Sequence, residues 1–428
     1  MEENELYSKL MNGYKTEFDR NGVSGQRVAA RLHKLSEIGR TGDGGSFRLG
    51  FSKEEQEAKR LLKSWMREAG LSVSDDEAGN VFGRMRGGNE PSSVLMSGSH
   101  LDSVPNGGHF DGPVGVISSL EIVEAWNASG FLPDFDYEVV IFSDEEGSRF
   151  QSGLTGSRAM TGKVDMDIQK GLKDSEGTAF PEVIQEVGLS DSTFAEAANH
   201  NKNIKEYVEI HIEQGKILEK ENLPVGIVSG IAGPCWLSVT FTGEAGHAGN
   251  TPMTARRDPL AAAGAFVSSI PDMPGEVSGS AVATVGKLEV RPNGANVIPG
   301  TVELIVDIRD IRKEDRDVLT ERIIEEAETL AEKHDVDVEY QQNFEVSPVP
   351  VPAETKELLR NAVNDEGIRA VEIPSGAGHD ALVIGHRYPV AMLFVRNKDG
   401  ISHTPEEWAG LNDIVQGIHV LKTYLEKK

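Results

Sequence analysis

The chain has 428 residues, of which 38% are hydrophobic and 26% are charged, as is ordinary for a globular protein with a buried core. Its formal net charge of −26 argues against binding to nucleic acid or to an anionic membrane surface. Its single cysteine, Cys235, rules out an intrachain disulfide and a cysteine-based zinc site. The acidic N-terminal segment lacks the apolar core of a signal peptide, and no apolar run is long enough to span a bilayer. We therefore expect a cytoplasmic protein.

The first half of the chain alternates between helix and strand patterns. Ser52 and Glu55 form a capping box that opens an amphipathic helix, and Gly70 is the expected end of that helix. A second helix is expected over residues 114–128. Short apolar or β-branched runs predict strands at residues 71–73, 80–85, 93–97, 137–143 and 207–212. Strand, helix and strand at this spacing indicate βαβ units and a mainly parallel sheet.

The pattern changes after residue 222. Strands are expected at residues 225–228, 237–242, 281–290, 301–308 and 336–341, with helices at 258–270 and 313–333. The order β-α-β-β-α-β within this stretch is typical of a small ferredoxin-like domain. After a proline-rich linker, helices at 353–365 and 412–425 and strands at 371–373 and 390–395 restore the alternation. We expect an α/β protein in which a mainly parallel-sheet domain, residues 1–222 and 343–428, carries an α+β insert, residues 223–342.

Side chains suited to a divalent metal follow several of the predicted strands: His100, Asp102, Asp111, Glu145, Glu146, His211 and His403. In open α/β sheets, ligands bind at the carboxyl edge, where these residues are expected. Taken singly, a histidine after a strand is more often structural, and a Glu-Glu pair is usually a solvated turn. Taken together, imidazole and carboxylate groups are the ligands of zinc and manganese sites.

The number of carboxylates favours two metal ions over one. Five ligands with one bridging carboxylate can hold two ions about 3.5–4 Å apart. Asp111 lies in a glycine-rich loop that lets a short side chain reach both ions, and Gly112 avoids crowding beside it. Asp102 is placed to hold the second ring nitrogen of His100. Of the adjacent Glu145 and Glu146, one can bind metal while the other acts as general base.

Longer motifs carry a resemblance to a known family. SHLDSVPNGGHFDGPVGV, FSDEEGSRF, HIEQGKILE, GEAGHAGNTPMTARRDP, PNGANVIPG and SGAGHDA resemble the hydantoinase/carbamoylase branch of the dinuclear zinc aminoacylase and carboxypeptidase-like hydrolases. That branch includes N-carbamoyl-L-amino-acid amidohydrolases, β-ureidopropionases and allantoate amidohydrolases. The resemblance runs from about residue 40 to residue 407. His211 departs from the peptidases of the group, which usually carry an acidic ligand there.

The resemblance implies roles for the metal-site residues, position by position. One ion is held by His100 and His211, the other by Glu146 and His403, and Asp111 bridges them, while Glu145 is the general base. The ions implied are zinc, or else manganese, cobalt or nickel. The two-segment domain is then the catalytic domain, and the insert is a lid and dimerisation domain.

The resemblance also implies substrate contacts. Gln214 matches a substrate-side residue, and His247 matches a lid histidine that reaches the partner subunit's site and stabilises the oxyanion. Asn296 and Arg309 match residues that hold the substrate carboxylate. Two residues of the SGAGHDA loop line the pocket, Gly378 and His379.

The residues alone leave simpler explanations open. A salt bridge to a neighbouring aspartate, Asp307 or Asp310, explains Arg309 equally well. Asn296 is ordinarily a turn residue, and Asp102 and Glu145 are equally explained as loop caps.

The activity implied is cleavage of the carbamoyl (ureido) C–N bond of N-carbamoyl-L-amino acids by attack of a metal-bound hydroxide, in a homodimer. The near alternative is an allantoate amidohydrolase. An aminoacylase or dipeptidase is disfavoured by His211. A non-catalytic binding protein is disfavoured by Glu145, because a pure binder needs no general base.

Overall fold

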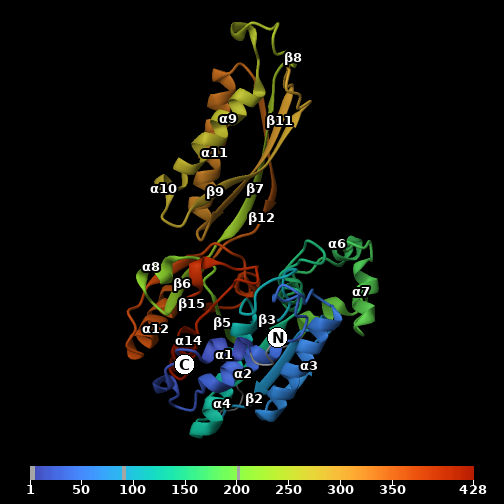
Figure 1. Ribbon diagram of the computed structural model, residues 1–428. Helices are drawn as coiled ribbons and strands as arrows, with labels where there is room; N and C mark the ends of the chain where they lie inside the picture. The colour runs from blue at the N-terminus through green and yellow to red at the C-terminus, as the bar shows by residue number, and fades with distance from the viewer. Residues whose placement is uncertain (1–4, 89–92, 200–202) are drawn as a thin grey trace. The chain divides into compact units, whose positions relative to one another are not determined.

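The computed structural model describes residues 5–88, 93–199 and 203–428 (Figure 1). The chain divides into two compact units. The first unit comprises Met1–Val228, Val351–Ile373 and His379–Lys428. The second unit comprises Ser229–Pro350 and Pro374–Gly378. In the part of the chain that the structure describes, no helix combines the length and the apolar character needed to cross a bilayer.

A nine-stranded sheet runs in the order β1-β2-β4-β3-β5-β15-β6-β13, with β14 paired to β6. The bounds are β1 Ser72–Asp75, β2 Val81–Met85, β3 Val94–His100, β4 Asp136–Phe142, β5 Ile204–Ile212, β6 Val225–Ile231, β13 Val349–Pro350, β14 Glu372–Ser375 and β15 Val390–Val395. The four central strands, β4, β3, β5 and β15, are parallel to one another. The strands that flank them pair antiparallel. The predicted α/β fold with a mainly parallel central sheet is confirmed.

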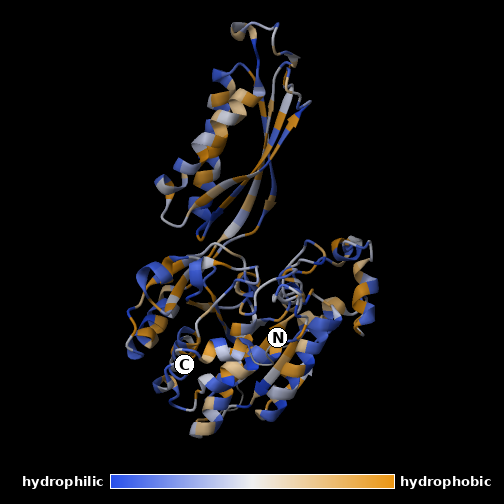
Figure 2. Cartoon of the chain, in the orientation of Figure 1, coloured by the Kyte–Doolittle hydropathy of each residue, from blue (hydrophilic) through white to orange (hydrophobic). Residues whose placement is uncertain are grey.

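Helices of the first unit pack against this sheet and against each other: α1 Glu5–Met11, α2 Gly25–Ser36, α3 Lys53–Glu68, α4 Pro113–Ser129, α12 Ala353–Asp365, α13 Asp380–Ile384 and α14 Leu411–Leu425. The central strands and α4 are largely apolar (Figure 2). Helix α3 begins after Ser52 as predicted, and the Ser52 hydroxyl accepts from the Glu55 N–H at 3.1 Å. The expected capping box is only partly formed, because the Glu55 carboxylate accepts from the N–H of Phe51 at 2.6 Å.

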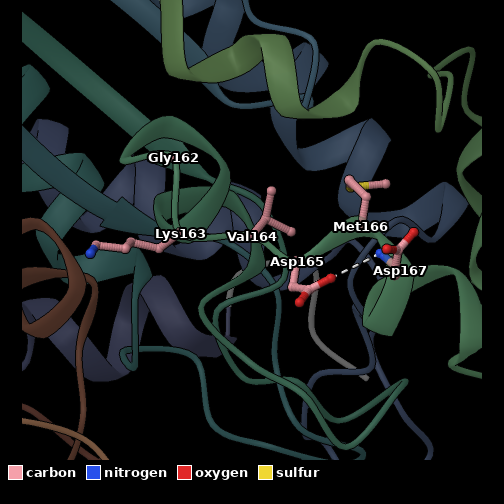
Figure 3. A pocket seen from close by; sticks show the side chains of 6 residues that line it. All are labelled: Gly162, Lys163, Val164, Asp165, Met166 and Asp167. Atoms are coloured by element: carbon pink, nitrogen blue, oxygen red, sulfur yellow. Dashed lines mark hydrogen bonds between the residues drawn. The ribbon is translucent and has the colours of Figure 1, made fainter.

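Short helices that the sequence did not indicate follow β4 and β5: α5 Thr155–Met160, α6 Met166–Gly171, α7 Phe180–Glu186 and α8 Ile217–Glu221. A surface hollow lies at the start of α6 and is lined by residues 162–167 (Figure 3). There the Asp165 carboxylate caps the helix by accepting from the N–H groups of Asp167 and Ile168 at 3.0 and 3.2 Å. None of the predicted site residues lines this hollow.

The second unit contains a four-stranded antiparallel sheet of order β12-β7-β11-β9. Its elements are β7 Gly233–Thr242, α9 Pro259–Ser269, α10 Pro274–Val277, β9 Val282–Arg291, β11 Thr301–Asp310, α11 Lys313–Lys333 and β12 Asp337–Glu345. Burial alternates along β7 and β11, as expected for strands with one covered face. Apolar side chains of α9 and α11, including Phe266 and Ile323, complete the core on that face.

Candidate metal and catalytic site

The carboxyl ends of the four central parallel strands supply the candidate metal residues. His100 is the last residue of β3, and Glu145 and Glu146 follow the end of β4. His211 lies at the end of β5, and His403 lies in the loop after β15. Asp111 lies in the loop between β3 and α4. Because parallel strands end at one edge, residues from distant parts of the sequence converge there.

The two carboxylate oxygens of Asp111 face different histidines. Its Oδ1 lies 3.0 Å from His211 Nε2 and 3.4 Å from His100 Nε2. Its Oδ2 lies 3.2 Å from His403 Nε2. Glu146 Oε2 lies 3.4 Å from the same His403 nitrogen. Two triads therefore share Asp111, and in each one the potential ligand atoms all lie within 4.8 Å of one another.

Burial and charge set the protonation of this cluster. Burial would raise the pKa of Asp111, but the charge of His211 and the close approach of the three histidine rings outweigh it and hold that pKa well below its ordinary value. Burial, followed by the charge of Asp111, raises the pKa of Glu146 to about 8. Burial also raises the pKa of Glu145 well above its usual range. A hydrogen bond with Asp111 raises the pKa of His403 to about 9, although burial opposes the shift.

The donor set fits divalent cations. Three carboxylates and three imidazoles meet in a region where all but His403 are almost fully buried. The buried Nε2 of His100 makes no hydrogen bond to any described residue, although Asp111 Oδ1 lies 3.4 Å away. A buried nitrogen without a partner is costly, and so are carboxylates packed together. A cation would relieve both, and its binding is what a buried histidine and carboxylate cluster indicates.

Asp102 contacts more of the site than the sequence suggested. Its backbone carbonyl lies 3.1 Å from His100 Nδ1, and its carboxylate Oδ1 lies 3.5 Å from the same nitrogen. The carboxylate also accepts from the backbone N–H groups of Glu145 and Glu146, at 3.1 and 3.0 Å. One side chain therefore links the end of β3 to both glutamates that follow β4.

Several site residues escaped the sequence reasoning. Ser402 donates to Asp111 Oδ2 at 2.8 Å, beside Gln214, whose Nε2 donates to the same oxygen at 2.7 Å. Glu407 accepts from the backbone N–H groups of Phe110 and Asp111. Ser402 and Glu407 flank His403 in the segment GISHTPEEW, so that motif was the only signal available.

His379 lies beside the cluster in the first unit. Its ring centroid is 4.4 Å from that of His211, and it forms a third potential ligand triad with Glu209 and His211. Burial, followed by the charge of His211, lowers the pKa of His379 well below its ordinary value. A neutral imidazole therefore lies next to one of the candidate ligands.

The remaining predicted substrate residues, His247, Asn296, Arg309 and Gly378, lie in the second unit. His247 and Asn296 are exposed neighbours, because β8 (Gly246–His247) pairs with β10 (Val297–Ile298) and the Ala248 N–H donates to the Asn296 carbonyl. Arg309 makes a forked pair with Asp307, at 2.9 and 2.8 Å, and donates to the Gly376 carbonyl at 2.8 Å.

Comparisons with known proteins agree with the motifs. Residues 96–427 match the model of peptidase family M20/M25/M40. The chain is 43% identical over 399 residues to an N-carbamoyl-L-amino acid amidohydrolase of Geobacillus stearothermophilus, covering 93% of this chain and 97% of that protein. It is 35% identical over 393 residues to an allantoate amidohydrolase of Bacillus subtilis, covering 92% and 95%. A hydantoinase/carbamoylase family amidase from Burkholderia multivorans superposes with a TM-score of 0.86 at 33% identity, covering 95% and 98%. The resemblance expected from the motifs is confirmed.

Proposed function

This chain belongs to peptidase family M20/M25/M40, and from that premise we propose that it is a metal-dependent amidohydrolase that cleaves the ureido C–N bond of N-carbamoyl-L-amino acids. It is a hydrolase of linear C–N bonds other than peptide bonds, as are its relatives named for N-carbamoyl amino acids and allantoate. The carbamoyl amino acid is the preferred substrate class because relatives with that name reach 43% and 41% identity, against 35% for the allantoate amidohydrolase of Bacillus subtilis.

The placement of Asp111 between two ligand sets carries the proposal. His100 and His211 face one of its oxygens, and His403 faces the other. We take Asp111 as the bridge between two divalent ions, with Glu146 completing the set on the His403 side. The ions are zinc, or manganese, cobalt or nickel. When bound, they would polarise the substrate carbonyl and lower the pKa of a water molecule.

Glu145 is the proposed general base. It accepts the proton of the attacking water and returns it to the leaving nitrogen. Its Oε2 lies 3.6 Å from His100 Nε2, and its backbone N–H is held by the Asp102 carboxylate. Burial raises the pKa of Glu145 above its usual range, which increases its affinity for the proton of the attacking water. His247 is the proposed donor to the tetrahedral oxyanion.

Substrate contacts are proposed residue by residue. In the first unit, Gln214 and His379 lie against the ligand cluster. In the second, Asn296 and Arg309 are proposed to bind the substrate carboxylate, and Gly378 to line the pocket. Arg309 has five N–H donors, of which three are used by Asp307 and Gly376. Among the residues that the structure describes, no partner takes the other two N–H donors, which we propose for the substrate carboxylate.

A substrate panel tests the proposal. Purified protein with added Mn²⁺ is assayed for release of ammonia from N-carbamoyl-L-amino acids, N-carbamoyl-β-alanine and allantoate, and for cleavage of N-acyl amino acids and dipeptides. We expect the highest kcat/KM with an N-carbamoyl-L-amino acid. A clear preference for allantoate would make the chain an allantoate amidohydrolase, and a preference for acyl or peptide bonds would make it an aminoacylase or dipeptidase. Metal-loaded protein without any turnover would contradict a catalytic role.

A further inference from the structure

Glu407 is a buried residue whose carboxylate contacts the backbone at Asp111, the proposed bridging ligand. Its side chain is 3% exposed, and its Oε1 accepts from the N–H groups of Phe110 and Asp111 at 2.8 and 3.0 Å. These two amides belong to the loop that follows β3, whereas Glu407 follows β15. Its carboxylate therefore joins two loops that are 296 residues apart in sequence.

The second oxygen of Glu407 reaches the Asp111 side chain through Ser402. The Ser402 hydroxyl lies 2.8 Å from Glu407 Oε2 and 2.8 Å from Asp111 Oδ2. A hydroxyl has one hydrogen, so it can donate to only one of these carboxylates at a time. Glu407 therefore contacts the N–H group of Asp111 directly, and the Ser402 hydroxyl lies within hydrogen-bond distance of both carboxylates.

The glycine-rich loop leaves room for this contact. A Cβ atom at Gly108 would lie 2.1 Å from Glu407 Oε1 and 2.5 Å from Glu407 Cβ. Because no real Cβ contact is that short, residue 108 must be glycine if the carboxylate is to approach the two amides. Glu407 therefore explains the glycine at position 108, whereas a Cβ atom at Gly107 would meet Val104 instead.

We propose that Glu407 is a positioning residue that fixes the backbone and the carboxylate orientation of Asp111 so that its two oxygens face two metal ions. The inference rests on the proposed bridging role of Asp111. Glu407 itself contacts neither substrate nor metal in this scheme. Groups that orient metal ligands from outside the coordination sphere typically change metal affinity about 10–100-fold when they are removed.

The test compares Glu407→Ala with Glu407→Gln in the full-length protein. Zn²⁺ affinity is measured by competition with a chelator, and amide hydrogen exchange of the segment containing Phe110 and Asp111 is measured in the metal-free protein. Glu407→Ala should weaken Zn²⁺ binding about 10–100-fold and speed exchange of both amides. Glu407→Gln should stay close to the parent in both measurements, because its amide oxygen can still accept from both N–H groups.

Two further variants separate positioning from general loss of stability. Glu121 is a buried glutamate on α4 that accepts from the Ser24 N–H and from Arg27. Glu121→Ala should lower the thermal midpoint without weakening Zn²⁺ binding. Gly108→Ala keeps the glutamate at position 407, but the added methyl group displaces its carboxylate. This variant should therefore also weaken Zn²⁺ binding, and it tests the proposal even if Glu407→Ala fails to fold.

The outcomes distinguish this inference from the proposed function. If Asp111→Ala loses both ions while Glu407→Ala and Gly108→Ala bind Zn²⁺ as the parent does, the positioning role is wrong and the bridge stands. If Asp111→Ala retains two ions, the bridge itself is wrong. Equal metal loss in Glu407→Gln and Glu407→Ala would also overturn the positioning role, because the hydrogen-bond geometry would then not be what matters.

Discussion

Glu145 and Glu146 are neighbours in the chain, yet their carboxylates face different histidines. Glu145 Oε2 lies 3.6 Å from His100, and Glu146 Oε2 lies 3.4 Å from His403. Glu145→Gln preserves shape but removes the proton acceptor. We expect metal content to be unchanged and kcat to fall about 10²–10⁴-fold, the usual contribution of a general base. Elemental analysis and steady-state kinetics would check both. A near-normal kcat would refute the role of Glu145 as general base. Loss of metal would indicate that Glu145 is the metal ligand and Glu146 the base.

Substitution of Arg309 tests whether the protein recognises the carboxylate of its substrate. A carbamoyl amino acid carries a free carboxylate, which a protein of net charge −26 repels at long range. Arg309→Ala should raise KM for N-carbamoyl-L-amino acids, leave metal content unchanged and narrow the preference for acids over their carboxamides. Arg309→Lys should restore little, because a point charge cannot replace the planar fork. An unchanged preference would mean that Arg309 has only a structural role, through its contacts with Asp307 and Gly376.

The pH dependence of metal binding follows from the raised pKa values. His403 has a pKa of about 9 and Glu146 a pKa of about 8, so both hold a proton at neutral pH in the metal-free protein. A cation must displace those protons, and the apparent affinity should therefore rise with pH between about 6 and about 9. Chelator-competition titrations with Mn²⁺ from about pH 6 to about pH 9 would show this. A metal affinity that stays constant across this pH range would contradict the presence of bound protons on His403 and Glu146.

Sequence reasoning found the site residues that carry distinctive chemistry and missed those that act through the backbone. Histidine and carboxylate after predicted strands pointed to His100, Asp111 and His403, which the structure brings together. The contacts of Glu407 with two main-chain N–H groups leave no pattern in the sequence, because any acceptor of suitable length could make them. Asp102 was expected beside His100, where the structure places it, but its bonds to two amides 43 and 44 residues away were not predicted.

Helix α4 begins and ends at glycines with positive φ, and only one of them touches the candidate site. Gly112 has φ 81° and ψ −59°, and a Cβ there would lie 2.6 Å from Cε1 of His100. Gly130 has φ 66° and ψ 22°, and no atom of a described residue lies within 4 Å of a Cβ built there. The two ends of α4 therefore offer a matched pair of substitutions.

Gly112→Ala should lower thermal stability and metal affinity together, since the added methyl group displaces a candidate ligand. Gly130→Ala should cost only about 1–2 kcal/mol for the left-handed backbone, with metal affinity unchanged. Thermal unfolding and Zn²⁺ titration of both variants provide the measurement. Equal metal affinity in the two variants would show that the turn does not position His100.

Some elements were predicted with the bounds that they have in the structure, whereas several helices were missed. α11, Lys313–Lys333, and β15, Val390–Val395, have the bounds that their apolar patterns indicated. The helices α5, α6 and α7 have six or seven residues each, too few to establish a 3.6-residue period. α2 was also missed, although Ser24 caps it by accepting from the Arg27 N–H.

At the scale of the whole molecule, chain topology creates the site. β15 lies beside β5 in the sheet although about 180 residues separate them, and this pairing brings His403 to the edge that carries His211. Alternating strands and helices made a parallel sheet predictable, and a parallel sheet gathers its ligands at one edge. The strand order was not predictable, because similar apolar strands are compatible with several orders. The sequence therefore indicated which residues meet without indicating how the sheet arranges them.

Homodimer formation stays a prediction, and the second unit indicates which surface would form the interface. β9 lies at the edge of its sheet, and its outer side pairs with no strand among the described residues. Leu288 on β9 is 44% exposed. Unpaired edge strands with apolar side chains are templates for pairing with another chain. We therefore expect a homodimer formed through this edge, with His247 serving the partner's site.

Leu288→Asp should make the protein monomeric and reduce activity at nanomolar concentration, while metal content stays that of the parent. Leu132→Asp is the matched control, because Leu132 is 57% exposed in the first unit, outside any strand. It should leave the dimer intact. Since each subunit carries a net charge of −26, added salt should screen the repulsion and tighten the parent dimer. Light scattering across salt concentrations measures both effects. A parent protein that is monomeric and fully active at nanomolar concentration would rule out the dimer, and with it the role of His247 across subunits.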